Sequence, residues 1–443
     1  MSYELESDFT DMSQAAAPDP ASVRIAKRAA IASMTGTAIE YYEFGIYGFM
    51  AVIIGPLFFP GDNPAAALLS ILAVFGSAFF IRPLGGILLG RIGDRIGRRK
   101  VLLLTVIGMG GATAAIGMLP VTASIGIAAP ILLVCLRLIQ GFFAGGEIIG
   151  AAAFVAESSP TGRRGFYGSF TPVGVALGGA LAAIICGLVT TILDAQQLQA
   201  WGWRIPFLLT LPLVLFSVHV RHHVEETPAF KQFISGSKKV AHTPFMSVLR
   251  GHSSALIRVV MLTFGQNAGY WIGVVFMNIY LTTYLGYEKQ HVFWLMAALG
   301  LCVAAMMPFW GGLSDRLGRR KLLLTGFVGY VVIVIPMMLL MDSHNIWIAA
   351  LAMLIATLPM PIIQSVGYPT YAEQFPTPVR YTAMAISINL GAILGGGITP
   401  YLVTALINKT GILLMPGFFM AFAALFSLFA LLRMRDTHKD SLK

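Results

Sequence analysis

The chain has 443 residues, of which 57% are hydrophobic and only 11% carry a charged side chain. An ordinary globular domain has about 25% charged residues, so this composition excludes a water-soluble protein. The formal net charge of +10 is compatible with a nucleic-acid partner, but basic and aromatic residues do not form the stripes that nucleic-acid binders use. We therefore expect lipid to surround most of the chain, and we expect no nucleic-acid partner.

The apolar segments are long enough to cross a bilayer. A spanning helix needs about 20 mainly apolar residues, and twelve such segments are separated by short polar runs. We therefore predict an all-α membrane protein with twelve transmembrane helices. The predicted spans are residues 29–57, 66–90, 101–120, 127–156, 164–192, 203–220, 255–285, 291–313, 322–341, 345–371, 380–407 and 411–432.

The positions of the basic residues predict the orientation. With the N-terminus in the cytoplasm, 25 of the 30 Lys and Arg residues fall in inner segments and only Lys289 and Lys409 in outer loops. Such an excess is typical of cytoplasmic loops, so we predict that both termini are cytoplasmic. The predicted order is a cytoplasmic tail at 1–28, a six-helix bundle at 29–220, a cytoplasmic linker at 221–254, a second six-helix bundle at 255–432 and a short tail at 433–443.

Two motifs occur in both bundles. Gly90-Arg-Ile-Gly-Asp-Arg-Ile-Gly-Arg-Arg-Lys100 follows the second span, and Gly311-Gly-Leu-Ser-Asp-Arg-Leu-Gly-Arg-Arg-Lys321 follows the eighth. Ala156-Glu-Ser-Ser-Pro-Thr161 after the fourth span likewise matches Ala372-Glu-Gln-Phe-Pro-Thr377 after the tenth. These repeats predict two pseudo-symmetric halves, a plan in which the binding site lies between the halves near the membrane midplane.

The charged residues and glycines of these repeats are candidates for a cytoplasmic gate. An Asp can pair with an Arg or with a helix N-terminus, and such a contact would hold the cytoplasmic face shut in one state and break in another. The alternative is a basic loop that serves only membrane topology. The candidates are Gly90, Asp94, Arg95, Gly97, Arg98, Arg99, Asp315, Arg316, Glu157, Arg164, Glu373 and Arg380.

Charged residues inside a span mark functional sites by default, because lipid makes them costly. Glu40 and Glu43 lie near the middle of the first span, and Arg137 and Glu147 lie in the fourth. Plausible pairings are Glu43 with Arg137, and Glu40 or Glu147 with Arg82. Our hypothesis is that Glu43 takes up a proton and thereby frees Arg137 to meet an anionic substrate, with Glu40 and Glu147 as further proton-coupling candidates. The alternative is that all of these charges form static structural pairs.

Arg82 is the candidate clamp for a substrate carboxylate, because the planar guanidinium matches a carboxylate with two hydrogen bonds. The alternative is an arginine that only packs helices together. The spans of the second half hold no charged residue at depth, so they would supply hydrogen bonds and aromatic walls. The further substrate-binding candidates are Tyr47, Gln140, Gln266, Asn267, Tyr270, Trp271, Gln364 and Asn389.

The motif from Gly90 to Lys100 resembles the loop between helices 2 and 3 of the major facilitator superfamily. Glu40-Tyr-Tyr-Glu-Phe-Gly-Ile-Tyr-Gly48 is similar to the first-helix signature of its metabolite:proton symporter family. Trp203-Arg-Ile-Pro-Phe207 is similar to a second motif of that family, which occurs later in the chain. The resemblance implies a carrier of a metabolite such as shikimate, 2-oxoglutarate, citrate or proline/betaine. Glu43 and Tyr41 stand where that family usually has Asp and often Trp, which weakens any assignment of substrate.

These observations predict a secondary active transporter and not an enzyme. We expect a monomer in the bacterial plasma (inner) membrane that takes up a small organic metabolite, above all an organic acid, together with protons by alternating access. The sequence contains no Walker pattern and no metal-ligand spacing, so we expect the proton gradient to drive transport without a cofactor or metal. The alternatives are a proline/betaine-type osmolyte symporter, which the short C-terminal tail disfavours, and a drug:proton antiporter.

Overall fold

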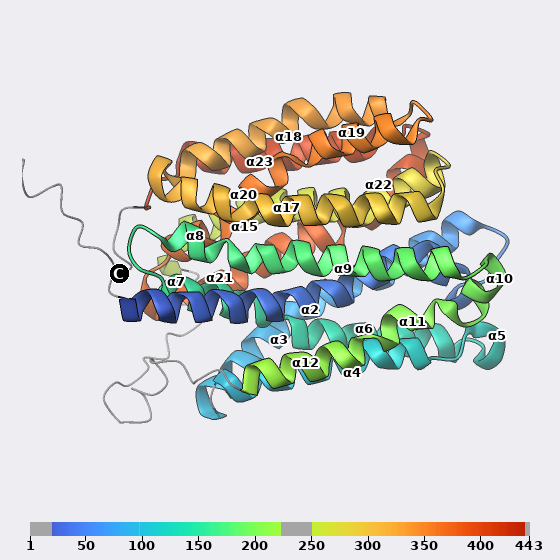
Figure 1. Ribbon diagram of the computed structural model, residues 1–443, viewed down its shortest axis with the longest axis horizontal. Coiled ribbons are helices and arrows are strands. Elements are labelled where there is room, and N and C mark those ends of the chain that lie inside the picture. The colour runs from blue at the N-terminus through green and yellow to red at the C-terminus, as the bar shows by residue number, and fades with distance from the viewer. Residues whose placement is uncertain (1–19, 97, 223–249, 439–443) are drawn as a thin grey trace, which may run out of the picture.

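The computed structural model describes residues 20–96, 98–222 and 250–438. The elements in these ranges are helices that run along the long axis of the molecule (Figure 1). Within them, twelve helical segments are long and apolar enough to cross a membrane. The predicted all-α fold with twelve spans is confirmed, whereas the cytoplasmic position of the termini stays a prediction. We call the end of the bundle at which α2 begins and α23 ends the basal end.

The N-terminal half supplies six of the twelve segments. Its first helix begins at Pro20, before the predicted span at 29–57, and the fourth, fifth and sixth spans are each built from consecutive shorter helices. The helices of this half are α2 (Pro20–Phe58), α3 (Pro64–Ile96), α4 (Arg98–Met118), α5 (Thr122–Ile125), α6 (Ala128–Ala144), α7 (Glu147–Ser158), α8 (Arg164–Gly168), α9 (Phe170–Ile192), α10 (Ala195–Gln197), η1 (Leu198–Gly202), α11 (Arg204–Leu208) and α12 (Thr210–His222).

The C-terminal half repeats this plan. Two of its spans contain wider π-helical turns, which occur frequently at functional sites, and one of these turns follows Trp271 directly. The helices are α15 (Ser253–Trp271), η2 (Ile272–Phe276), α16 (Met277–Ile279), η3 (Tyr280–Tyr284), α17 (Lys289–Leu317), α18 (Arg319–Met341), α19 (Ile346–Thr357), α20 (Pro359–Glu373), α21 (Thr377–Ala392), η4 (Ile393–Gly397), α22 (Thr399–Thr410) and α23 (Met415–Leu432).

The two halves meet along two seams. On one side α9 packs against both α2 and α17 (Figure 1). On the other side α3 packs against α21, η4 and α22. At the second seam the backbones approach so closely that a side chain at position 76 would collide with the carbonyl group of Gly397. Glycine at position 76 permits this approach. A central region is thus enclosed between the halves.

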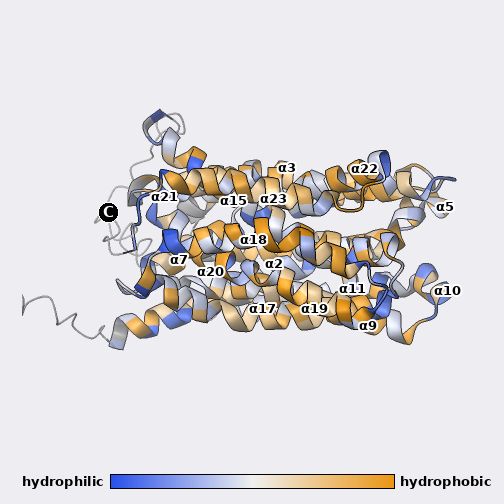
Figure 2. Ribbon diagram, turned by 90° about the horizontal axis from the view of Figure 1, so that it is seen from above, coloured by the Kyte–Doolittle hydropathy of each residue, from blue (hydrophilic) through white to orange (hydrophobic). Residues whose placement is uncertain are grey.

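The outer surface of the bundle is apolar. Figure 2 shows hydrophobic residues along the middle of the bundle and hydrophilic ones mainly toward its ends. Large apolar side chains such as Leu215 and Trp347 remain 71% and 81% exposed. Contact with water would cost about 25 cal/mol per Å² of such surface, and lipid tails remove this cost. The chain is therefore a multi-pass membrane protein.

Close packing of α3 against α6 brings two buried arginines into one region. A β-carbon at Gly141 would collide with the carbonyl of Ala78, and one at Gly145 would collide with the carbonyl of Arg82. Glycines allow membrane helices to approach at this distance. The contact places Arg82 of α3 and Arg137 of α6 on neighbouring backbones, where both reach toward α2.

Candidate functional site

An ion pair between Glu40 and Arg82 lies midway along α2 and α3. Arg82 Nη2 is 3.2 Å from Glu40 Oε1, and both side chains are buried. The Cζ atom of Arg82 lies 4.2 Å from the ring centroid of Phe44 and 4.6 Å from that of Phe79. The Nε atom of Arg82 has no hydrogen-bond partner among the described residues. Glu40 is one of the two partners predicted for Arg82, and the guanidinium keeps a donor for a further acceptor.

Glu43 and Arg137 are linked through two polar side chains. Thr113 Oγ1 donates to Glu43 Oε2 at 2.7 Å, and Gln140 Nε2 donates to Thr113 Oγ1 at 2.8 Å. Arg137 Nη1 donates to Gln140 Oε1. In the part of the chain that the structure describes, no ion pair joins Glu43 to Arg137. The two charges predicted to pair are thus separated by Thr113 and Gln140, which form a relay between them.

Arg137 is held further by aromatic rings and a backbone carbonyl. Its Nη2 atom donates to the carbonyl of Phe75 at 3.1 Å. Its Cζ atom lies 4.1 Å from the ring centroid of Tyr47 and 4.9 Å from that of Phe44. A desolvated guanidinium over an aromatic face is stabilised by about 2 kcal/mol. These contacts explain how a cation is tolerated in the core without a carboxylate in direct contact.

Trp271 brings the C-terminal half into this centre. Its ring centroid lies 5.2 Å from Phe75 and 5.3 Å from Phe79, and it stacks on Tyr41 at 5.9 Å. The indole Nε1 atom is buried and has no hydrogen-bond partner among the described residues. A buried Trp usually finds such a partner. The indole N–H is therefore available to an acceptor that enters the region between the two halves.

Two predicted substrate ligands of the C-terminal half contact each other. Gln266 Nε2 donates to Gln364 Oε1 at 2.6 Å, and the hydroxyl of Tyr371 donates to Gln266 Oε1. All three side chains are buried. A substrate that reaches Gln266 or Gln364 would have to exchange partners with this small network.

The remaining predicted ligands donate to backbone carbonyls in this structure. The contacts are Tyr47 to Ile71 at 3.4 Å, Asn267 to Thr263 at 2.8 Å, Tyr270 to Val175 at 3.4 Å and Asn389 to Gly145 at 3.3 Å. Asn389 and Tyr270 bridge the two halves, because each reaches a carbonyl in the N-terminal half. These two side chains thus help to keep the centre closed.

Glu147 lies apart from this centre. It begins α7, ten residues after Arg137 and so about 15 Å farther along the helix axis. Its Oε2 atom accepts a hydrogen bond from Thr105 Oγ1 at 3.1 Å, and the side chain is buried. Of the four predicted proton-coupling residues, the structure gathers Glu40, Glu43 and Arg137 in the centre and leaves Glu147 nearer the basal end.

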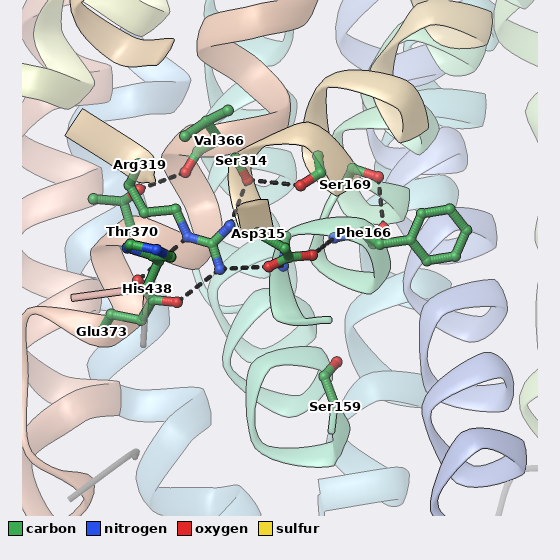
Figure 3. A network of polar contacts seen from close by, with 12 residues as sticks. Ser159, Phe166, Ser169, Ser314, Asp315, Arg319, Val366, Thr370, Glu373 and His438 are labelled. Carbon is green, nitrogen blue, oxygen red and sulfur yellow. Dashed lines mark hydrogen bonds and ion pairs between the residues drawn. The ribbon is translucent and has the colours of Figure 1, made fainter. Parts of the chain in front are cut away.

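A network of charged groups closes the basal end (Figure 3). Arg319 Nη2 lies 2.9 Å from Asp315 Oδ1 and 3.0 Å from Glu373 Oε1. Asp315 also accepts hydrogen bonds from the backbone N–H groups of Gly165 at 2.8 Å and Phe166 at 2.9 Å. These two groups belong to the first turn of α8, where a carboxylate is stabilised by the helix dipole. Because α8 belongs to the N-terminal half and Asp315 to the C-terminal half, the contact ties the halves together.

A second tie joins the halves at the same end. Arg380 Nη1 of α21 lies 3.1 Å from Glu157 Oε1 of α7. Of the other predicted gate residues, Arg164 is buried, Gly90 lies in α3 facing the ring of Tyr381, and Arg316 is exposed. The side chains of Asp94, Arg95, Arg98 and Arg99, and Gly97 as a whole, lie outside the described residues.

Arg319 was not among the predicted gate residues, although it is the arginine that pairs with Asp315. Gly318 follows the last residue of α17 and has a φ of 95°, and Arg319 begins α18. This sharp change of direction turns Arg319 inward while Arg316 stays exposed. Nothing in the motif from Gly311 to Lys321 indicated which of its arginines turns inward.

The chain after α23 joins the same network, which the sequence did not indicate. Asp436 accepts hydrogen bonds from the backbone N–H groups of Arg319 and Arg320, each at 3.2 Å. Thr437 Oγ1 donates to Glu373 Oε2 at 3.1 Å. A side chain at Gly318 would collide with the Asp436 carboxylate. The segment therefore caps the first turn of α18 and contacts the gate.

Replacing Asp436 by Asn is expected to loosen this cap. Asn offers one acceptor oxygen in place of two, so one of the two backbone N–H groups loses its partner, at a cost of about 1–3 kcal/mol. We expect hydrogen–deuterium exchange at the amides of Arg319 and Arg320 to become at least about tenfold faster. The control is Asp342→Asn at the other end of α18, where these amides should exchange at the native rate. Native exchange in Asp436→Asn would show that the segment does not cap α18.

The same contact has an expected pH range. Burial alone would raise the pKa of Asp436, but hydrogen bonds from the N–H of Arg319, the His438 side chain and the N–H of Arg320 hold that pKa below its ordinary value. The ionised form is therefore favoured in the folded protein. The cap should persist across neutral and mildly acidic pH and be lost only as pH falls below about 4, the ordinary pKa of an Asp.

Comparisons with known proteins agree with this architecture. The family model described as "Major Facilitator Superfamily" matches residues 30–386 and 259–443. A proline/betaine transporter of Salmonella typhimurium is 35% identical over 425 residues, which cover 94% of this chain and 85% of the relative. The shikimate transporter of Escherichia coli is 35% identical over 392 residues, covering 86% of this chain and 88% of the relative. A solved structure of the proton:xylose symporter XylE shares the fold with a TM-score of 0.79 at 17% identity, covering 95% of this chain and 98% of that one.

Proposed function

The chain belongs to the Major Facilitator Superfamily of membrane transporters, and on that premise we propose that it takes up a small carboxylate-bearing metabolite together with protons. The single observation that carries the proposal is the pair of buried charge clusters, Glu40–Arg82 and Glu43–Arg137, in the centre between the halves. The Glu40–Arg82 cluster would bind the substrate carboxylate, and the Glu43–Arg137 cluster would take up the proton. The driving force is the proton gradient, with no cofactor.

Substrate recognition is assigned to Arg82. A charge-assisted hydrogen bond to a carboxylate is about twice as strong as a neutral one, and the free Nε of Arg82 offers such a bond without breaking its contact with Glu40. Trp271 supplies a second donor from the opposite half through its unpartnered Nε1. A substrate held by both residues joins the two halves, which is what an occluded intermediate requires.

Proton coupling is assigned to Glu43. In its ionised form the Glu43 carboxylate attracts the Arg137 guanidinium, to which it is linked by hydrogen bonds through Thr113 and Gln140. A proton on Glu43 removes that attraction, so Arg137 can turn its charge toward an incoming carboxylate. A buried cation without an anion is costly, so substrate and proton stabilise the loaded site only together. This mutual requirement is what couples the two fluxes.

Alternating access follows from the two ties at the basal end. The Asp315–α8 and Glu157–Arg380 contacts hold that end shut, and opening requires both to break. We assign the basal end to the cytoplasm of a bacterial cell and the protein to its inner membrane as a monomer, in line with the distribution of basic residues. The described parts of the predicted tails and linker, at 20–28, 221–222, 250–254 and 433–438, then lie on the cytoplasmic side, and residues 1–19, 223–249 and 439–443 of these segments lie outside the described residues.

A second candidate substrate class is a zwitterion such as proline or betaine. The rings of Tyr41, Phe44, Phe79 and Trp271 contact one another. Arg82, the partner of Glu40, lies over two of these rings, and aromatic faces recognise quaternary ammonium groups. Arg82 would bind the carboxylate of such a compound and the rings its cationic end. A relative of this chain is named for proline and betaine transport, which supports this second class.

Uptake into proteoliposomes tests the proposal. The panel would contain radiolabelled shikimate, 2-oxoglutarate, citrate, proline and glycine betaine, each with and without an imposed inward proton gradient. We expect one class to accumulate above equilibrium and a protonophore to abolish the accumulation. Accumulation of an acid without an amine names the first class, and accumulation of betaine or proline names the second. Equilibration without accumulation for every compound would refute proton-driven uptake.

A further inference from the structure

Both buried arginines of the centre lie over the ring of one residue, Phe44. The Cζ atom of Arg82 is 4.2 Å from the ring centroid, and that of Arg137 is 4.9 Å away. Phe44 itself is completely buried and follows Glu43 directly in α2. We infer that Phe44 is a positioning residue whose π face holds both guanidiniums and couples the Glu40–Arg82 pair to the Glu43–Arg137 relay.

The physical basis is the negative face of the aromatic ring. A cation above such a face is attracted more strongly when water is excluded, and each of these cations is buried. Each guanidinium also polarises the π electrons of the ring toward itself, so a shift of one arginine changes the attraction that the other one feels. Phe44 is thus the group through which a change at Arg137 reaches Arg82.

The position of Phe44 on α2 supports this role. Residues three and four apart lie on one face of a helix, so Glu40, Phe44 and Tyr47 form a stripe together with Glu43. Each carboxylate of the stripe is connected to one arginine, directly at Glu40 and through side chains at Glu43. Phe44 stands between the two connections. It also contacts Trp271 of the other half, at 6.3 Å between ring centroids.

A purely structural role for Phe44 makes a different prediction. A residue that only fills space depends on volume and shape, and fluorine atoms on the ring change these little. A residue that acts through its π face depends on the electron density of the ring, which each fluorine reduces. Graded fluorination therefore separates the two roles.

The experiment incorporates 4-fluoro-, 3,5-difluoro- and 3,4,5-trifluorophenylalanine at position 44 of the full chain. The matched control is the same series at Phe49, which is equally buried in α2 and packs edge-on against Phe293 at 5.9 Å. No arginine lies over the Phe49 ring in the described part of the chain. The probes are radiolabelled glycine betaine and shikimate, measured in gradient-free binding and in proton-driven uptake.

At position 44 we expect probe affinity to fall stepwise, by about tenfold across the series, because Arg82 loses its support. We also expect the pH of half-maximal uptake to move stepwise toward lower values. A weaker ring leaves Arg137 more strongly attracted to ionised Glu43, so more acid is needed to load the proton. The series at position 49 should change neither quantity.

Flat affinity and a flat pH profile across the series at position 44 would overturn the inference. Equal gradients at positions 44 and 49 would also overturn it, because fluorination would then act through packing. The expected shift in the pH of half-maximal uptake rests on the proposed proton symport, whereas the expected loss of probe affinity does not. If the unsubstituted protein binds a probe but shows no proton-driven uptake, the proposed function fails, and the binding series still decides the role of Phe44.

Discussion

Replacing Glu43 by Gln is expected to abolish accumulation of substrate against a gradient while leaving exchange intact. Gln has nearly the same shape and keeps an oxygen that can accept the hydrogen bond from Thr113. It cannot bind or release a proton, so it resembles the protonated carboxyl permanently. We expect the accumulation ratio to fall to about one, and counterflow of preloaded substrate to stay within about threefold of the native rate.

The measurement compares proton-driven uptake with counterflow between pH 5.5 and 8.5. Native uptake should decline as pH rises, because Glu43 must be protonated on the outside to load. Counterflow by Glu43→Gln should be independent of pH in the same range. The matched control is Glu288→Gln, which alters an exposed carboxylate at the start of α17 and should behave like the native protein. Continued accumulation by Glu43→Gln would assign the proton to another group.

The second large effect is expected at Arg82, where binding and stability can be separated. Arg82→Gln leaves Glu40 as a buried charge without its cation, and breaking one partner of a buried pair costs about 3–5 kcal/mol. It also removes the donors proposed for the substrate carboxylate, which should weaken binding at least about 100-fold. The single variant should therefore be both less stable and unable to bind.

The double variant Glu40→Gln with Arg82→Gln serves as the control. Two neutral amides can hydrogen-bond to each other in place of the ion pair, so we expect most of the native melting temperature to return. Binding should remain lost, because the cation is still absent. Native affinity in the double variant would show that Arg82 only packs helices, which is the alternative stated for this residue. Unchanged stability in the single variant would contradict the Glu40–Arg82 ion pair itself.

The fold was predictable because a membrane constrains sequence strongly. Twelve apolar segments and two copies of one loop motif are enough to predict two six-helix halves, since unpaired backbone groups cannot face lipid. Periodicity also placed Glu40 and Glu43 on one face of the first helix. It could not show which neighbour each carboxylate meets, because the rotation and spacing of helices far apart in sequence decide this.

Three features of the site illustrate that limit. The relay through Thr113 depends on α4 facing α2, and nothing in the local sequence around Thr113 signals it. Arg319 differs from Arg316 only by lying beyond the bend at Gly318. Asp436 looks like an ordinary residue of a short charged tail, although its carboxylate caps a distant helix. Each of these contacts joins residues that are far apart in the sequence or separated by a bend. Their residue types are common elsewhere in the chain, so type alone does not identify them.

The central claim is that substrate and protons cross together through the two charge clusters. Purified protein in liposomes that contain a pH-sensitive dye tests it most directly, with no imposed proton gradient and with substrate added outside. Glycine betaine and shikimate are the probes, and the membrane potential is clamped. The account predicts acidification of the lumen that follows substrate entry in the native protein and is absent in Glu43→Gln. Substrate entry at the native rate with no change in internal pH would contradict the account.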